Sequence, residues 1–200
     1  MKIFDLSMDI DDETPFFPGS PKQEILQAAT VAKDGWNEKR LSFNSHFSTH
    51  IDVPLHMIDG GKSLSDFPIE HFIGEAISLD VFGQKTIESP LEDVKANDMV
   101  FFYTGKTEQP LSQLYRDYPV LSRRTAELLV EKKVKIVGLD SWSPDSEPFS
   151  IHKILLGSNI LIVENLVNLK PLAGKRFECF ILPLKIRGGD GAPCRVIARL

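Results

Sequence analysis

The chain has 200 residues, of which 42% are hydrophobic and 26% charged, as expected for one ordinary globular domain covering residues 1–200. This composition excludes a disordered chain and a fibrous repeat, and a formal net charge of −5 without a basic cluster argues against a nucleic-acid partner. No apolar run approaches the roughly 20 residues that cross a bilayer, and the first residues do not resemble a secretion signal. We therefore expect a cytoplasmic protein without a membrane partner.

Short runs of β-branched and aromatic residues predict a mixed β-sheet, and the segments between them predict helices that cover it. In chain order, the expected elements are a short helix over 68–72, strands over 76–82 and 99–103, a helix after Ser122, a strand over 135–139, a short helix over 150–156, and strands over 160–163, 177–184 and 195–198. Ser122 is a favourable N-cap for the longest of these helices. The predicted fold class is α/β, with a strand order that these patterns do not determine.

The two cysteines, Cys179 and Cys194, lie in apolar segments and lack a CxxC spacing. This pattern is typical of small buried side chains, and not of a disulfide framework or a thiolate metal site. Histidine and carboxylate side chains are therefore the remaining candidates for a functional site.

Three of the five histidines lie within eleven residues, and an aspartate lies among them. These four residues are His46, His50, Asp52 and His56. Imidazole and carboxylate groups are ligands that zinc, manganese and iron accept, and a catalytic zinc site commonly uses about three of them. The cluster therefore predicts a metal site. The alternative is a polar loop with exposed or hydrogen-bonded histidines, and the isolated His71 is interpreted as structural.

The spacing within this cluster predicts a bend in the chain. His50 and Asp52 are two residues apart, so on a strand their side chains point to one face and can bind one metal. His46 is four residues from His50, a helical spacing, but nearby β-branched residues and Pro54 disfavour a helix. Four residues of an ideal strand span roughly 13 Å, too far for two ligands that each lie about 2 Å from one metal. The chain must therefore bend near Ser48.

His56 lies two residues after Pro54, where regular strand pairing is expected to end. It is predicted to face the same cavity without being a ligand. It would then carry protons, a role that requires a pKa near the working pH.

A second signal lies far downstream, where Glu164 follows the apolar run 160–163. An unpaired carboxylate buried there would cost several kcal/mol or take up a proton, so it needs a positive partner. His152 precedes it by twelve residues on a segment that can return beside the strand, and a divalent metal would compensate the carboxylate. The alternative places Glu164 at an exposed strand end and His152 on a helix surface.

The segment from His46 to His56 resembles the HxGTHxDxPxH signature of the cyclase-like metal hydrolases, which include bacterial kynurenine formamidase and isatin hydrolase. The resemblance extends over nearly the whole chain, through the segments 17–21, 138–141, 162–166, 182–185 and 189–193. It implies a swivelling β/β/α domain, in which a mixed, barrel-like sheet is flanked by helices. It also implies a homodimer or homotetramer.

The resemblance further implies the residues of the site and one or two divalent ions per subunit. His46, His50 and Asp52 would bind a first ion, Asp52 with His152 and Glu164 a second, and His56 would transfer protons. In the mechanism that we expect, Glu164 assists His56. Histidine and carboxylate ligands suit zinc and manganese alike.

Two departures from the family pattern separate this chain from its best-known members. The glycine of the signature is Ser48 here, at the expected bend, where a positive φ would strain a serine. The loop 141–144 also differs from that of kynurenine formamidases. The identity of the substrate therefore does not follow from the resemblance.

The resulting hypothesis is hydrolysis of an amide, formamide or lactam carbon–nitrogen bond in a small-molecule substrate. Divalent ions would lower the pKa of bound water, polarise a carbonyl and stabilise the oxyanion, so no serine or cysteine nucleophile is required. Phe16, Phe17 and Trp142 are candidates for an aromatic wall, and equally for ordinary packing. The alternatives are a metal-dependent cyclase or dehydratase acting on a polyketide-like substrate, and a metal-binding homologue without turnover.

Overall fold

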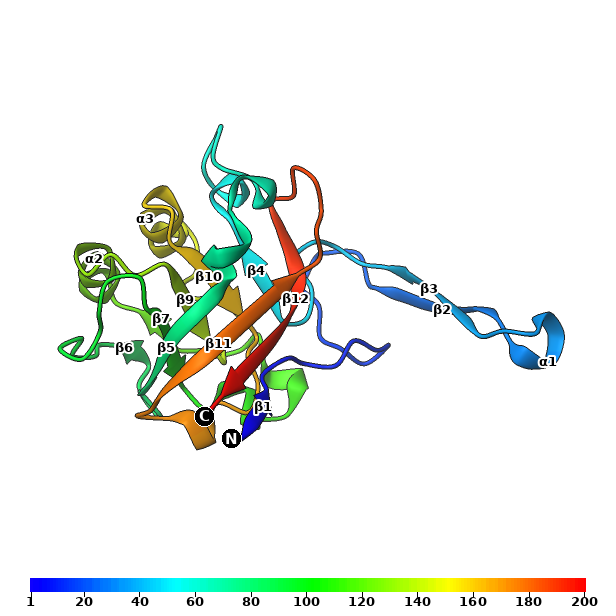
Figure 1. Cartoon of the computed structure of the whole chain (residues 1–200), viewed down its shortest axis with the longest axis horizontal. Helices are drawn as coiled ribbons and strands as arrows, with labels where there is room; N and C mark the ends of the chain where they lie inside the picture. The colour runs from blue at the N-terminus through cyan, green and yellow to red at the C-terminus, as the bar shows by residue number, and fades with distance from the viewer.

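The main β-sheet closes into a barrel. The computed structural model describes residues 1–200, apart from the side chain of residue 111. Eight strands follow the order β1-β12-β11-β5-β7-β9-β10-β4, and a further pairing of β12 with β4 closes all but β1 into a barrel (Figure 1). The strands are β1 (Ile3–Asp5), β4 (His50–Asp52), β5 (Ile73–Asp80), β7 (Met99–Tyr103), β9 (Ile136–Leu139), β10 (Leu161–Glu164), β11 (Arg176–Pro183) and β12 (Gly191–Arg199). Parallel pairing of β5, β7, β9 and β10 beside antiparallel pairs confirms the predicted mixed, barrel-like sheet.

Alternating side chains along the strands divide the hydrophobic core in two. In β7, Met99 and Phe101 join a cluster that draws residues from every barrel strand and fills the barrel. Val100 and Phe102 point the other way, into a second cluster that also contains helix residues. Both faces of these strands are therefore buried, which explains their nearly continuous apolar sequences.

Two helices, α2 (Arg123–Glu131) and α3 (Ser150–Gly157), lie side by side on the outer face of the sheet (Figure 1). Both were predicted, and the Ser122 side chain accepts a hydrogen bond from the Thr125 N–H as the expected N-cap. Residues 68–72 differ: they form a short 3₁₀ helix, η3 (Ile69–Phe72), with Pro68 as the preceding cap. None of the helices in the described chain has the length and apolar character to cross a membrane.

Two strands differ from their expected bounds by more than one residue. The strand expected over 76–82 is β5, which ends at Asp80 because the Asp80 carboxylate accepts a hydrogen bond from the Phe82 N–H and begins a turn. The strand expected over 195–198 is β12, which begins at Gly191. Its first residues pair with β4, an arrangement that glycine and proline in the sequence conceal.

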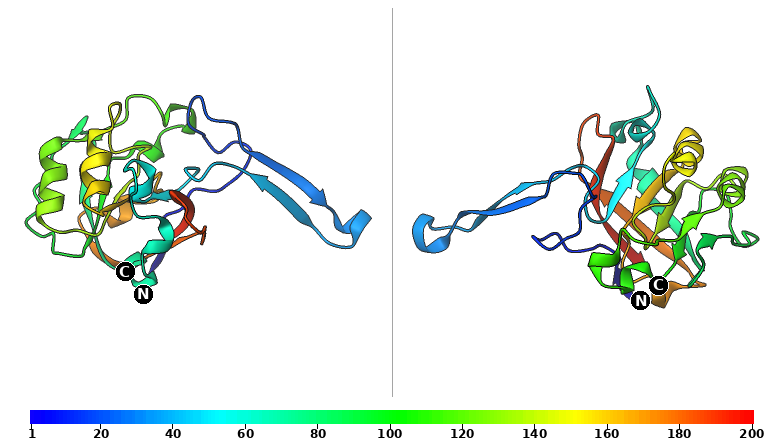
Figure 2. Two further views of the ribbon diagram at one scale, coloured as in Figure 1. Left: turned by 90° about the horizontal axis from the view of Figure 1, so that it is seen from above. Right: turned by 180° about the vertical axis from the view of Figure 1, so that it is seen from behind.

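A long hairpin, the arm, projects from the barrel (Figures 1 and 2). It consists of β2 (Glu24–Ala29) and β3 (Glu38–Ser42), joined through the short helix α1 (Val31–Asp34). The sequence patterns did not predict it. Leu26, Trp36 and Leu41 on the arm are each more than half exposed. The remaining elements are the strand pair β6 (Thr86–Ile87) and β8 (Val120–Leu121), and the 3₁₀ turns η1 (Pro54–His56), η2 (Leu64–Asp66), η4 (Lys106–Glu108), η5 (Leu111–Gln113) and η6 (Lys170–Leu172).

Candidate metal centre

Strand register places three of the expected site residues on one face of the barrel wall. In β4, Ile51 points into the barrel core, so His50 and Asp52 point outward. Because β4 pairs antiparallel with β10, Glu164 lies directly opposite His50. The three residues are at most 4% exposed, so two carboxylates and an imidazole meet away from bulk water.

The bend expected at Ser48 is present and brings His46 back to this group. Ser48 adopts a left-handed conformation with φ of 58°. His46 Nδ1 then lies 2.6 Å from Asp52 Oδ1. The Ser48 carbonyl also lies 2.9 Å from His50 Nδ1 and accepts a hydrogen bond from the Asn165 side-chain amide. The bend therefore both returns His46 and orients His50.

His152 reaches the site from α3, whose start is fixed by Asp145. One oxygen of the Asp145 carboxylate accepts hydrogen bonds from the Ile151 and His152 N–H groups at the helix N-terminus. The other oxygen lies 2.5 Å from His152 Nδ1. One buried carboxylate therefore sets both the beginning of the helix and the orientation of its imidazole.

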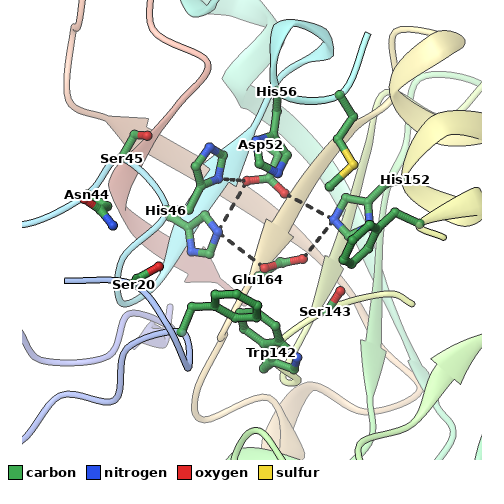
Figure 3. Close-up of a pocket in the computed structure, with 14 residues that line it drawn as sticks. Ser20, Asn44, Ser45, His46, Asp52, His56, Trp142, Ser143, His152 and Glu164 are labelled. Atoms are coloured by element: carbon green, nitrogen blue, oxygen red, sulfur yellow. Dashed lines mark hydrogen bonds and ion pairs between the residues drawn. The ribbon is translucent and has the colours of Figure 1, made fainter. Parts of the chain in front are cut away.

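The inner nitrogens of these histidines face the two carboxylates (Figure 3). His50 Nε2 lies 3.3 Å from Asp52 Oδ1 and 3.3 Å from Glu164 Oε2. His152 Nε2 lies 3.3 Å from Glu164 Oε1 and 3.7 Å from Asp52 Oδ2. The polypeptide thus brings together two stretches that are more than a hundred residues apart in sequence.

The donor set fits a divalent cation. The outer nitrogen of each imidazole faces an oxygen: His46 Nε2 faces Asp190 Oδ2 at 3.0 Å, His50 Nδ1 the Ser48 carbonyl, and His152 Nδ1 Asp145. A ring nitrogen that donates outward leaves the other nitrogen free to bind a metal, an arrangement common around metal ligands. Glu164 Oε1 is buried and makes no hydrogen bond within the described residues. A cation would satisfy it directly.

Burial and charge act against each other on the pKa values of the site. Burial lowers the pKa of His46 and of His50, but the adjacent carboxylates, Asp52 foremost, raise them to about 9 and about 10. For His152, Asp145 and Asp52 overcome burial and raise the pKa to about 12. Burial likewise disfavours ionised Asp52, yet the facing imidazoles hold its pKa well below the usual value. The protein alone therefore retains protons here that a cation would displace.

His56 has a different environment. Its ring centroid lies 3.8 Å from that of His46 and 6.1 Å from that of His152. Burial lowers its pKa below the ordinary value, although Asp52 opposes this. A neutral imidazole at neutral pH can accept a proton, which agrees with the expected role.

A cavity of about 400 Å³ opens over these residues (Figure 3). Its apolar lining comes from Phe17, Met57, Trp142 and Phe149. The rings of Phe17 and Trp142 stack with centroids 4.7 Å apart and an interplanar angle of 17°. Phe16 lines a separate surface depression, so only two of the three aromatic candidates meet in the cavity.

The structure gathers all six expected site residues, but it groups them differently and adds two carboxylates. Possible ligand atoms lie within 4.8 Å of one another in two sets, one of His50, Asp52 and Glu164, the other of His46, Asp52 and His56. Sequence reasoning missed Asp145 and Asp190. A carboxylate before a predicted helix was the available signal for Asp145, whereas Asp190 depends on a strand pairing that no local pattern indicates. His71, interpreted as structural, lies between Phe67 and Phe72 outside the cavity.

Comparison with known proteins identifies the family. The family model described as putative cyclase matches residues 4–146. The chain belongs to this cyclase family. A kynurenine formamidase of Salinibacter ruber is 30% identical over 208 residues, covering 100% of this chain and 98% of the relative. An uncharacterised protein of Methanocaldococcus jannaschii is 32% identical over the whole length of both chains.

Solved structures of cyclase-family and related proteins have the same fold. A predicted metal-dependent hydrolase from Bacillus stearothermophilus superposes with a TM-score of 0.83 at 25% identity, covering 98% of this chain and 97% of the other. Isatin hydrolase A from Labrenzia aggregata, bound to benzyl benzoate, gives a TM-score of 0.88 at 22% identity and covers 98% of this chain and 93% of its own. The expected swivelling β/β/α architecture is therefore confirmed.

Proposed function

We propose that this cyclase-family chain is a metal-dependent hydrolase that cleaves an amide, formamide or lactam carbon–nitrogen bond. The observation that carries this proposal is the convergence of three imidazoles on Asp52 and Glu164 at the base of a partly aromatic cavity. Relatives named kynurenine formamidase and structural neighbours named metal-dependent hydrolase support the reaction class. Phe17 and Trp142 would hold a flat small-molecule substrate.

One or two divalent ions, zinc or manganese, would be held by the buried cluster. We assign a first ion to His46, His50 and Asp52, and a second to Asp52, His152 and Glu164. Asp52 is the shared ligand, because its two oxygens face histidines from different elements. A bound ion supplies a Lewis acid that polarises a carbonyl and lowers the pKa of water at the site.

The chain's own residues would perform the proton transfers. His56 is the neutral imidazole beside the ligands, so it accepts a proton from water and returns it to the leaving amine. Glu164, opposite His50, is placed to assist from the other side of the site. The two cysteines are buried and free, which leaves no thiol in the cavity to act as a nucleophile.

A second candidate function uses the same ligands without adding water. The family model carries the description putative cyclase, and one structural neighbour is titled a potential metal-dependent hydrolase with cyclase activity. A cyclase or dehydratase acting on a polyketide-like substrate would use the cation to stabilise an enolate. A third reading, a metal-binding homologue without turnover, does not account for His56, which binding alone would not need.

Metal analysis joined to an activity screen tests the proposal. The purified protein would be analysed for bound metal and assayed on N-formyl aromatic amines, cyclic amides and esters, with products weighed by mass spectrometry. We expect activity that a chelator removes and a specific divalent ion restores, and products whose masses add up to the substrate plus one water: two fragments from a formamide or ester, and one ring-opened product from a cyclic amide. A product lighter by one water would support the dehydratase, and a metal-loaded protein inert toward all substrates would support the non-catalytic homologue.

We also propose that the protein is a homodimer or homotetramer. The arm presents Leu26, Trp36 and Leu41 to solvent in this single chain. An isolated two-stranded hairpin is marginally stable in water, so packing against a second copy would stabilise it. The cytoplasmic location stays a prediction, with which two free cysteines agree.

A further inference from the structure

The loop before β12 carries a carboxylate that faces two histidines at once. Asp190 Oδ2 lies 3.0 Å from His46 Nε2 and 3.9 Å from His56 Nδ1. These are the outer edges of two rings whose centroids are 3.8 Å apart, with 33° between their planes. The Asp190 side chain is 43% exposed and lies outside the cavity lining, so it meets the histidines from the solvent side.

Backbone contacts fix the position of this carboxylate. The Asp190 carbonyl accepts a hydrogen bond from the Val53 N–H at 3.2 Å, and the Gly189 carbonyl accepts one from the Leu64 N–H at 2.8 Å. The next residue, Gly191, pairs with Asp52 across β12 and β4. Asp190 is therefore held in register with the strand that carries the shared metal ligand.

Close packing makes the arrangement dependent on glycine. A Cβ atom at Gly191 would lie 2.7 Å from His46 Cε1 and 2.6 Å from the Ile51 carbonyl oxygen. Only a residue without a side chain allows β12 to pass this close to His46. The loop is thus built so that Asp190 reaches around the ring of His46 to its outer nitrogen.

We propose that Asp190 is a positioning residue that orients both His46 and His56. Its carboxylate accepts the Nε2 proton of His46, which leaves Nδ1 of that ring to face Asp52. The same oxygen lies 3.9 Å from His56 Nδ1, beyond hydrogen-bond distance, and its negative charge favours the proton on Nδ1 of that ring, which leaves Nε2 as the nitrogen that exchanges protons with substrate. The assignment rests on the proposed function and adds to it a coupling: one carboxylate keeps a metal ligand and the proton-transfer residue in compatible tautomers.

The first test reads the tautomers directly and needs no substrate. Zinc-loaded protein, labelled with ¹⁵N at histidine, would be compared with Asp190→Asn and Asp190→Ala by long-range ¹H–¹⁵N correlation spectra. Asp59→Asn is the matched control, since Asp59 is an exposed carboxylate in the turn that follows His56. We expect a single tautomer for His56 in the parent and control, and mixed His56 tautomers in Asp190→Ala, whereas bound zinc fixes the tautomer of His46 in every variant. An unchanged His56 tautomer in both Asp190 variants would overturn the proposal for His56, and the role at His46 is tested by zinc affinity.

Zinc affinity then tests the role of Asp190 at His46. Competition with a chromophoric chelator should show zinc affinity about 10- to 100-fold weaker in Asp190→Ala, because ligand orientation is lost. If Asp190→Ala does not fold, Asp190→Asn, which keeps the shape of the side chain, carries the same measurement. Affinity within twofold of the parent in the folded variants would contradict the role at His46.

A double-mutant comparison addresses His56 once a substrate is known. The fall in kcat caused by Asp190→Asn should shrink severalfold in a His56→Gln background, because the residue through which Asp190 acts is absent. Equal falls in both backgrounds would remove His56 from the proposal. If the protein is inert toward every substrate, the proposed function fails, whereas the tautomer and zinc measurements still decide the role at both rings.

Discussion

The barrel and the arm differ in how their strands are paired and in how far their side chains are buried. In the barrel, β4 is paired on both sides, with β10 and β12, and its side chains are buried on both faces. In the arm, β2 and β3 pair only with each other, and all five residues of β3 are exposed (Figure 2). The metal centre is thus specified by contacts within one chain, whereas Leu26, Trp36 and Leu41 of the arm remain more than half exposed in that chain.

The barrel and the arm can therefore be tested by separate variants. Changes in the barrel should alter metal binding and turnover without altering assembly. Changes in the arm should do the reverse. A barrel variant that alters assembly, or an arm variant that alters metal binding or turnover, would show that the two regions depend on each other. One example would be an arm that completes the cavity of a second copy.

Asp52→Asn should have the largest effect. It removes the negative charge from the shared ligand, and we expect kcat/KM to fall by at least about 1,000-fold, since a metal contributes several kcal/mol to stabilising the transition state. Metal content by elemental analysis should fall in parallel, while sedimentation should report an unchanged assembly. Asp59→Asn serves as the control. A dissociated Asp52→Asn protein would contradict the division between barrel and arm.

His56→Gln should lower kcat by about 100-fold or more, the usual contribution of a general acid or base. Metal content should stay at the parent value, because His56 is assigned to proton transfer and not to ligation. The measurement combines steady-state kinetics with elemental analysis. Loss of metal in this variant would instead make His56 a ligand, as its grouping with His46 and Asp52 permits.

Trp36→Ser in the arm should weaken self-association by about 30-fold, the effect of losing one central aromatic anchor. Analytical ultracentrifugation over a concentration series measures this change, and zinc affinity should match the parent. Lys33→Ser, on the same arm and also exposed, is the control for a general effect of substitution there. An unchanged association constant for Trp36→Ser would exclude the arm tip from the interface.

Metal affinity should rise with pH by about tenfold per unit for each proton displaced. Despite burial, the carboxylates raise the pKa of His46 to about 9 and of His50 to about 10, so the metal-free protein holds these protons at pH 7. Binding of the first ion must release them, and the gain in affinity at that site should level off above pH 10. Calorimetry in buffers of different ionisation enthalpy counts the protons. Zinc binding at pH 7 without proton release would contradict this charge state.

Ser48→Gly should have the smallest effect. Glycine relieves the positive φ but loses the hydrogen bond from the Ser48 hydroxyl to the Met8 carbonyl, so the free energy of unfolding should change by less than about 1 kcal/mol. Ser48→Ala loses the hydrogen bond and keeps the strained φ, so it should be the less stable of the two. Urea denaturation of both variants measures the difference.

Most of the barrel was predictable because local sequence carries the information. The strand over 99–103 was predicted at its observed bounds, since a buried strand needs a continuous apolar run. The bend at Ser48 followed from distance alone: His46 and His50 cannot share a cation along a straight strand. His152 and Glu164 were found because a carboxylate that ends a buried run needs a partner.

The features that could not be predicted, Asp190 and the arm, depend on contacts between residues far apart in sequence or on contacts outside the chain. Asp190 lies near its neighbours only because β12 pairs with β4. The segment that pairs begins with Gly191 and contains Pro193, residues that do not indicate a strand in the sequence. The arm has charged residues along β3 and no alternating apolar face, so it does not follow the usual strand pattern. Asp145 was the one omission that a local signal, its place before a predicted helix, could have corrected.

The pairing of β4 with β10 and β12 also determines when the site can exist. Asp52 lies opposite Ile162 and Gly191, so a nascent chain that has already exposed its histidines still lacks the strands that align them. Nearly the entire polypeptide must leave the ribosome before the ligands converge, and such long sequence separations slow folding. An ion that binds only the assembled site would then act late, drawing the population toward the closed barrel by mass action.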